Sequence, residues 1–106
     1  MNTRDDIKRV ISTILQSCNF SNAKIVLFGS KARNDFNQDS DWDLLIIVPQ
    51  DLTRNEKLEI SYQIRRSLAK KHIPCDIIIR SESELESFKK RVNSVTKTAI
   101  EEGVPL

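Results

Sequence analysis

Two stretches of the sequence decide the fold: Ile25-Val26-Leu27-Phe28-Gly29-Ser30-Lys31-Ala32-Arg33-Asn34 and, after a polar loop, Ser40-Asp41-Trp42-Asp43-Leu44-Leu45-Ile46-Ile47-Val48. In the first, four apolar residues run into Gly29. They predict a buried strand with an abrupt end, because glycine lets the backbone turn where a side chain would clash. We expect a short helix next, whose first turn has free N–H groups that can bind a phosphate. The first stretch therefore predicts a phosphate-binding turn.

The side chains at this turn suit a nucleoside triphosphate. The hydroxyl of Ser30 and the cations of Lys31 and Arg33 can add to the backbone N–H groups of Gly29 and Ser30 as phosphate ligands. These four residues, Gly29, Ser30, Lys31 and Arg33, are the predicted nucleotide-binding residues.

Two carboxylates stand at the head of the second apolar stretch. Asp41 and Asp43 are separated by one residue, so on a strand both side chains point to the same side. Two parallel carboxylates repel each other unless a cation lies between them. Hard divalent ions take oxygen ligands, and Mg²⁺ completes its coordination with substrate phosphates and water. A triphosphate turn beside this pair predicts a site for phosphoryl or nucleotidyl transfer.

The remaining chain predicts an α/β (α+β) fold, with a small mixed sheet of three or more strands covered by helices. The strand over 42–48 should lie inside the sheet, because it is apolar on both faces beyond Asp43. The expected elements are helix 3–18, strand 24–28, strand 42–48, a helix from the capping box Thr53-Arg54-Asn55-Glu56 to about Lys71, strand 76–79, and a helix from Ser81 or Ser83 to Glu102 stopped by Gly103 and Pro105.

The order of these elements brings the acidic residues together. A strand-helix-strand crossover makes the second and third strands parallel, with a right-handed connection. Parallel strands place Asp76, which we expect to open the third strand, at the same sheet edge as Asp41 and Asp43. If the first strand is antiparallel to the second, the outgoing Gly29-Ser30 turn reaches that edge too. The sequence therefore predicts one site at which all these residues meet.

Length and composition set further bounds. With 106 residues, 39% of them hydrophobic, the chain predicts a single domain, 1–106, with one modest core. A balance of 17 basic and 15 acidic residues lacks the basic excess of proteins that bind long nucleic acids. Cys18, Cys75 and the single histidine, His72, show no zinc or disulfide pattern. No apolar run has transmembrane length and the N-terminus lacks a signal-peptide core, so we expect a cytoplasmic protein without membrane contact.

Gly29-Ser30, ten further residues and Asp41-x-Asp43 resemble the signature of the DNA polymerase beta-type nucleotidyltransferase superfamily. The flanking residues most resemble its smallest members, the minimal nucleotidyltransferases (MNT, MntA-like). This resemblance implies a nucleotidyltransferase (polymerase beta palm-like) fold, ATP as the donor and two Mg²⁺ ions. It also implies that Asp41, Asp43 and Asp76 are both the metal ligands and the catalytic residues.

The minimal nucleotidyltransferases that this chain resembles are typically the antitoxin half of toxin-antitoxin pairs. Their partner is a HEPN-domain ribonuclease. The resemblance implies a hetero-oligomer in which AMP passes from ATP to a tyrosine of the HEPN toxin. Two alternatives stay open. The chain could be a non-catalytic, nucleotide-binding antitoxin that acts by binding its toxin, or a nucleotidyltransferase for a small molecule, whose pocket a homodimer would complete.

Three other features of the helix over 53–71 and its surroundings are expected to be structural. The basic stretch Arg65, Arg66, Lys70 and Lys71 could meet a nucleotide or an acidic partner, but we expect it to be a solvated helix face. Tyr62 and Trp42 are expected to pack in the protein interior, and not to stack on a nucleotide base.

Overall fold

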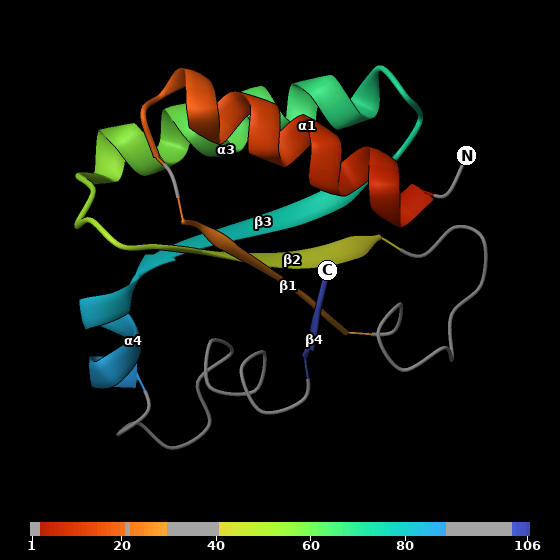
Figure 1. Ribbon diagram of the computed structural model, residues 1–106. Coiled ribbons are helices and arrows are strands. Elements are labelled where there is room, and N and C mark those ends of the chain that lie inside the picture. Colours follow the sequence, from red (N-terminus) through yellow and green to blue (C-terminus); the bar gives the residue numbers. More distant parts are fainter. Residues whose placement is uncertain (1–2, 21, 30–40, 89–102) are drawn as a thin grey trace.

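A four-stranded mixed sheet lies at the centre of the computed structural model, which describes residues 3–20, 22–29, 41–88 and 103–106 (Figure 1). The strand order is β3-β2-β1-β4. β1 (Lys24–Phe28) is antiparallel to β2 (Trp42–Val48), and β2 is parallel to β3 (Cys75–Ser81). The predicted strand directions and the inner position of β2 are therefore confirmed.

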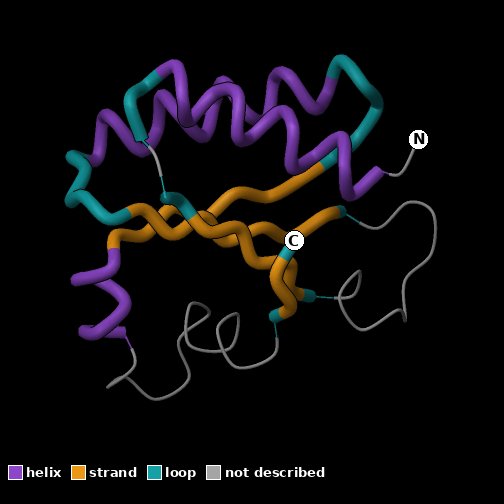
Figure 2. The backbone as a smooth tube through the Cα atoms, in the orientation of Figure 1, coloured by secondary structure: helices purple, strands orange, loops and turns teal. Residues whose placement is uncertain are grey.

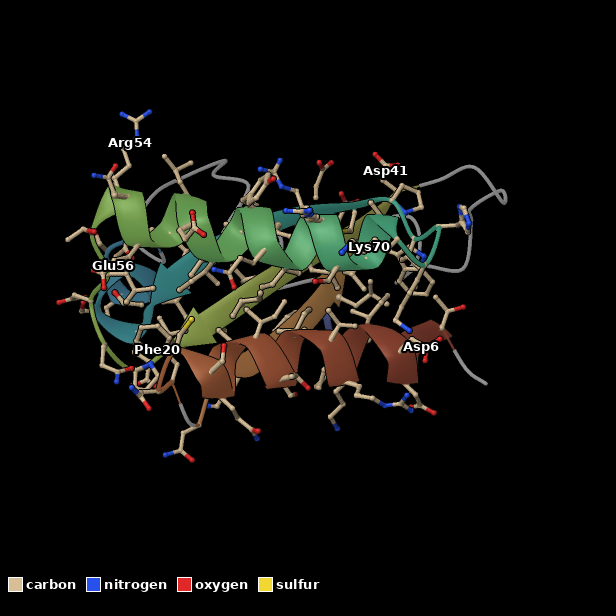
Figure 3. All side chains as sticks on the ribbon, turned by 90° about the horizontal axis from the view of Figure 1, so that it is seen from above. Asp6, Phe20, Asp41, Arg54, Glu56 and Lys70 are labelled. Carbon is tan, nitrogen blue, oxygen red and sulfur yellow. The ribbon has the colours of Figure 1, made fainter. Side chains whose placement is uncertain are left out.

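Two helices cover one face of this sheet. α1 (Thr3–Ser17) and α3 (Arg54–Ala69) lie side by side above the strands in Figure 2 and are seen from above in Figure 3. None of the described helices is long and apolar enough to cross a membrane. The core between helices and sheet is apolar and consists of Ile7, Ile11, Leu15, Leu27, Leu44, Ile46, Val48, Ile60, Ile64, Leu68, Ile73 and Ile79.

The alternation of side chains along β2 shows which of its residues point away from the two helices. Because Leu44 and Ile46 of β2 belong to the core under the helices, the alternate residues Asp43, Leu45 and Ile47 point to the opposite face. Leu45 is fully buried there. The central strand thus contributes apolar side chains to both faces, as its sequence predicts.

Two reciprocal capping boxes fix where the next helices begin. At α3, the Glu56 N–H donates to Thr53 Oγ1 at 3.1 Å, and the Thr53 N–H donates to Glu56 Oε1 at 2.9 Å. At α4 (Glu82–Phe88), the Glu84 N–H donates to Ser81 Oγ at 3.2 Å and the Ser81 N–H donates to Glu84 Oε1 at 3.0 Å. The buried Ser81 therefore ends β3 and caps α4 at once.

The structure differs from the sequence prediction in its last third. β3 begins at Cys75, one residue before the expected start, and continues to Ser81. The predicted helix to Glu102 begins as α4, and residues 89–102 lie outside the described residues. The sequence predicts a helix stop at Gly103 and Pro105, but Val104–Pro105 form β4, antiparallel to β1. Proline is tolerated there because β4 is an edge strand.

The sequence predicts that two aromatic side chains pack against the protein, but the structure partly buries one of them and exposes the other. Trp42 lies partly buried against the core, as predicted. Tyr62 on α3 is 52% exposed, so its predicted packing role is wrong. The helical spacing places Tyr62 away from the buried stripe formed by Ile60, Ile64 and Leu68.

An ion pair joins α3 to α4 and makes stability depend on pH. Lys57 Nζ lies 2.7 and 2.6 Å from the two carboxylate oxygens of Glu84. Burial raises the pKa of the Glu84 carboxyl, but the hydrogen bonds from Lys57 and the Ser81 N–H outweigh burial and hold that pKa below its ordinary value of 4.5. A pKa that is lower in the folded state than in the unfolded state adds stability. That stability is present at a pH above the ordinary pKa and is lost as the pH falls through the lowered pKa.

We therefore expect Glu84→Gln to be less stable than the native chain at pH 7, with a difference that shrinks as the pH falls below 4.5. Urea unfolding at neutral and acidic pH measures this difference. Glu82→Gln, which alters an exposed carboxylate in the same helical turn, is the control. A difference between Glu84→Gln and the native chain that is equal at both pH values would contradict the prediction.

Candidate active site

Two carboxylates lie beside each other near the start of β2 and β3. Asp43 is paired with Asp76 in the parallel register, so both side chains point to the same face of the sheet, away from α1 and α3. Asp76 is exposed and Asp43 is partly buried. Neighbouring strands are about 4.8 Å apart, so the two negative charges repel each other and favour a cation between them.

The turn after β1 approaches the same carboxylates. Phe28, the last residue of β1, is paired with Asp43, and Gly29 follows with a positive φ of 75°. A Cβ atom on Gly29 would lie only 2.1 Å from Asp43 Oδ2. Position 29 thus requires glycine for two reasons, the left-handed backbone and the close contact. The other predicted nucleotide-binding residues, Ser30, Lys31 and Arg33, lie outside the described residues.

The third predicted acid lies at the same end of the sheet. Asp41 is exposed and precedes β2 by one residue. Burial, with added contributions from the negative charges of Asp76 and Asp41, raises the pKa of the Cys75 thiol to about 11, so both carboxylates lie near the residue that opens β3. Figure 3 shows Asp41 at the end of the molecule where α3 ends, with Lys70 close by in that view.

The structure therefore brings Gly29, Asp41, Asp43 and Asp76 to one end of the sheet, where β1 ends and β2 and β3 begin. We call this end the carboxylate rim. The predicted meeting of Gly29, Asp43 and Asp76 is confirmed, and Asp41 lies at the same end of the sheet. Their roles in metal binding and catalysis stay predictions. Sequence reasoning missed the contact between Gly29 and the Asp43 carboxylate and the place of Cys75 at this rim, because each depends on strand register.

The carboxylate rim has the chemistry of a divalent-cation site. Among the described residues, no three His, Cys, Asp or Glu side chains are gathered closely enough to hold a metal ion. Mg²⁺, however, is usually held by one or two carboxylates together with substrate phosphates and water. Asp43 and Asp76, side by side on one face, fit that requirement.

Comparison with known proteins assigns the family. The family model described as "Nucleotidyltransferase domain" matches residues 7–104, almost the whole chain. The chain belongs to this nucleotidyltransferase family. The carboxylate rim and the Gly29 turn thus lie within the matched domain, and the chain is a nucleotidyltransferase enzyme.

Two relatives of this nucleotidyltransferase come from Methanocaldococcus jannaschii, and both carry the name protein adenylyltransferase. One is 35% identical over 89 residues, which cover 84% of this chain and 87% of the relative. The other is 31% identical over 104 residues, which cover 97% and 96% of the two chains. The predicted resemblance to small nucleotidyltransferases is confirmed by these matches along nearly the whole length of both relatives.

Solved structures share the fold of this nucleotidyltransferase. A chain from a toxin-antitoxin complex with AMP-PNP superposes with a TM-score of 0.60 at 17% identity, over 92% of this chain and 69% of that one. A chain from the complex of the tri-AMPylated Shewanella oneidensis HEPN toxin with its MNT antitoxin gives a TM-score of 0.52 at 14% identity, over 93% and 70%. The predicted fold class is therefore confirmed.

Proposed function

We propose that this nucleotidyltransferase is an antitoxin that transfers AMP from ATP to a tyrosine hydroxyl of a HEPN-domain toxin. The observation that carries this proposal is the pairing of Asp43 with Asp76, on one face of the sheet, beside the Gly29 turn. The adenylyltransferase name of the two relatives supports AMP as the transferred group. The toxin-antitoxin complexes with the same fold, one of them with AMP-PNP, support the donor and the partner.

In this proposal the acids of the carboxylate rim hold two Mg²⁺ ions. Asp41 and Asp43 would bind both ions, and Asp76 would bind the one on the side of the attacking hydroxyl. When bound, Mg²⁺ neutralises the charge on the reacting phosphate and lowers the pKa of the attacking oxygen. The N–H groups after Gly29 and the side chains of Ser30, Lys31 and Arg33 would hold the β- and γ-phosphates.

The reaction is a displacement at the α-phosphorus of ATP. The tyrosine oxygen forms a bond to that phosphorus, the bond to the β-phosphate oxygen breaks, and pyrophosphate leaves. The tyrosine proton passes to the carboxylate of Asp76, which is exposed at the rim and within reach of an acceptor from solution. The product carries a new negative charge and a bulky nucleotide, which would repel RNA at the toxin's own active site.

The test is to incubate the purified chain with ATP, Mg²⁺ and the HEPN-domain protein encoded by the adjacent gene. We expect intact-mass spectrometry to show a gain of one or more adenylate units on the HEPN protein, and tandem mass spectrometry to locate them on tyrosine. We expect the gain to disappear when EDTA removes the metal.

Two outcomes would contradict the proposal. In the first, the native chain and Asp43→Asn both neutralise the toxin and neither causes a mass gain. The chain would then be a non-catalytic antitoxin. Adenylation of an added aminoglycoside, with none of the HEPN protein, would leave an enzyme that acts on small molecules.

A further inference from the structure

A groove runs along the outer edge of the sheet, between α3 and β3. It has a volume of about 260 Å³, and Arg54, Lys57, Leu58 and Ser61 line it from α3. Four consecutive residues of β3, 77–80, line it from below. Because alternate residues of a strand point to opposite faces, a groove that touches four in succession follows the strand edge. Among the described strands, β3 has β2 as its one hydrogen-bonded neighbour.

This groove combines an open strand edge with exposed apolar side chains. Leu58 is 54% exposed and Tyr62, one helical turn further along α3, is 52% exposed. Arg80 covers the far end of the edge, where its guanidinium donates to the Ile79 carbonyl oxygen at 2.9 Å. Because no other described strand pairs with the outward side of β3 near Cys75, an extended segment of another chain can add to β3 there.

A basic residue lies at one end of the groove, and a second lies on the same side of α3 beyond the lining residues. Arg54 stands at the start of α3, and Arg65 follows eleven residues later on the same stripe of the helix. Both are exposed, and neither forms an ion pair with another described residue. No acidic side chain lines the groove within the described part of the chain. Such a surface favours a partner that carries carboxylates around an apolar centre.

The groove leads directly to the carboxylate rim. In the strand-helix-strand unit, α3 runs opposite to β3, so Arg54 lies near Arg80 and Arg65 lies near Cys75. The positive charge of Arg65 lowers the pKa of the Cys75 thiol, whereas the charges of Asp76 and Asp41 raise it, so Arg65 lies near the residue that opens β3. A chain that lies in the groove would therefore reach Asp76 at its end.

We propose that the groove between α3 and the edge of β3 binds an extended acidic segment of the protein that accepts AMP, and so delivers the acceptor residue to the carboxylate rim. This inference rests on the proposed function and names the surface that selects its protein substrate. The segment adds a strand to the edge of β3, places apolar side chains on Leu58 and Tyr62, and pairs carboxylates with Arg54 and Arg65.

The distance between Arg54 and Arg65 sets the length of that segment. Arg54 and Arg65 are about 16 Å apart along the helix axis, which corresponds to about five residues of extended chain. The outward edge of β3 between Cys75 and Ile79 has the same number of residues. The acceptor segment therefore needs about five extended residues with acidic side chains near both ends.

The experiment measures binding without ATP, so that its result does not depend on AMP transfer. The probe is the HEPN-domain protein of the adjacent gene, titrated calorimetrically into the native chain and four variants. Leu58→Glu and Arg65→Glu alter the groove. Thr13→Glu and Lys8→Glu make the same changes of charge at exposed positions of α1 and are the matched controls. We expect Kd to rise by about tenfold or more for the groove variants and to stay unchanged for the controls.

Hydrogen exchange of the native complex provides a second readout. We expect the HEPN protein to protect the amides of residues 75–79 and the outer side of α3. Transfer assays should show a raised KM for the HEPN protein in Leu58→Glu, which lies away from the rim, with kcat at saturation and ATP binding unchanged.

Two results would overturn this inference. In the first, the HEPN protein protects another surface and both groove variants bind it as the native chain does, even if AMP transfer proceeds. In the second, the groove is protected in the chain alone as concentration rises, which would assign it to a homodimer. Normal binding in the groove with no AMP transfer would instead reject the proposed function and support the docking surface.

Discussion

Asp43→Asn is expected to lower the rate of AMP transfer by about a thousandfold and to leave the fold intact. Asparagine retains the size of aspartate and an oxygen ligand, but removes the negative charge that lies beside Asp76 in the strand register. The metal and the phosphate charge that it neutralises are then held less strongly. The same exchange removes a repulsion between two carboxylates, so the variant should be as stable as the native chain or slightly more stable.

Single-turnover transfer to the HEPN protein, followed by mass spectrometry, measures the rate, and urea unfolding measures the stability. Asp5→Asn, which alters an exposed carboxylate in the first turn of α1, is the control and should retain full activity. Native rates in Asp43→Asn would remove this residue from the catalytic site.

Gly29→Ala is expected to impair both stability and activity. The positive φ at this position costs an alanine about 1–2 kcal/mol. The added Cβ would also meet Asp43 Oδ2 at 2.1 Å, so the carboxylate must move. A displacement of about 1 Å in a catalytic site can lower the rate by about a hundredfold. We therefore expect a loss of that size in AMP transfer, together with a lower free energy of unfolding.

Gly29→Asn separates these two effects. Asparagine tolerates the left-handed backbone better than alanine, but it carries the same Cβ. We expect urea unfolding to show that Gly29→Asn is more stable than Gly29→Ala, while both variants have similarly low transfer rates. Restored transfer in Gly29→Asn would show that backbone strain, and not contact with Asp43, limits the alanine variant.

The sheet around the carboxylate rim was predictable because its signals are local. β1 and β2 begin and end at the predicted residues, since apolar runs are bounded by Gly29 in one and by Asp41 and Pro49 in the other. The parallel direction of β3 followed from the length of the crossover through α3. The order of the elements then placed Asp76 at the same end of the sheet as Asp43, and the structure adds the register that pairs the two residues.

Other features could not be read from the sequence, because they depend on tertiary contacts. β4 has only two residues, one of them proline, and exists because Val104 pairs with Leu27. Ser81 reads as a turn residue, yet it is a buried strand end that also caps α4. Arg65 reads as a solvated cation, and only the packing of α3 on β3 places it beside the rim.

Both capping boxes lie at the end of the molecule opposite to the carboxylate rim, as the positions of Glu56 and Asp41 in Figure 3 illustrate. The contacts that start α3 and α4 are therefore remote from the residues that we propose to bind substrates. Over evolutionary time, the acidic end can exchange side chains and adopt new targets while the opposite end preserves the architecture. A small enzyme divided in this way can change what it modifies without first having to gain stability elsewhere.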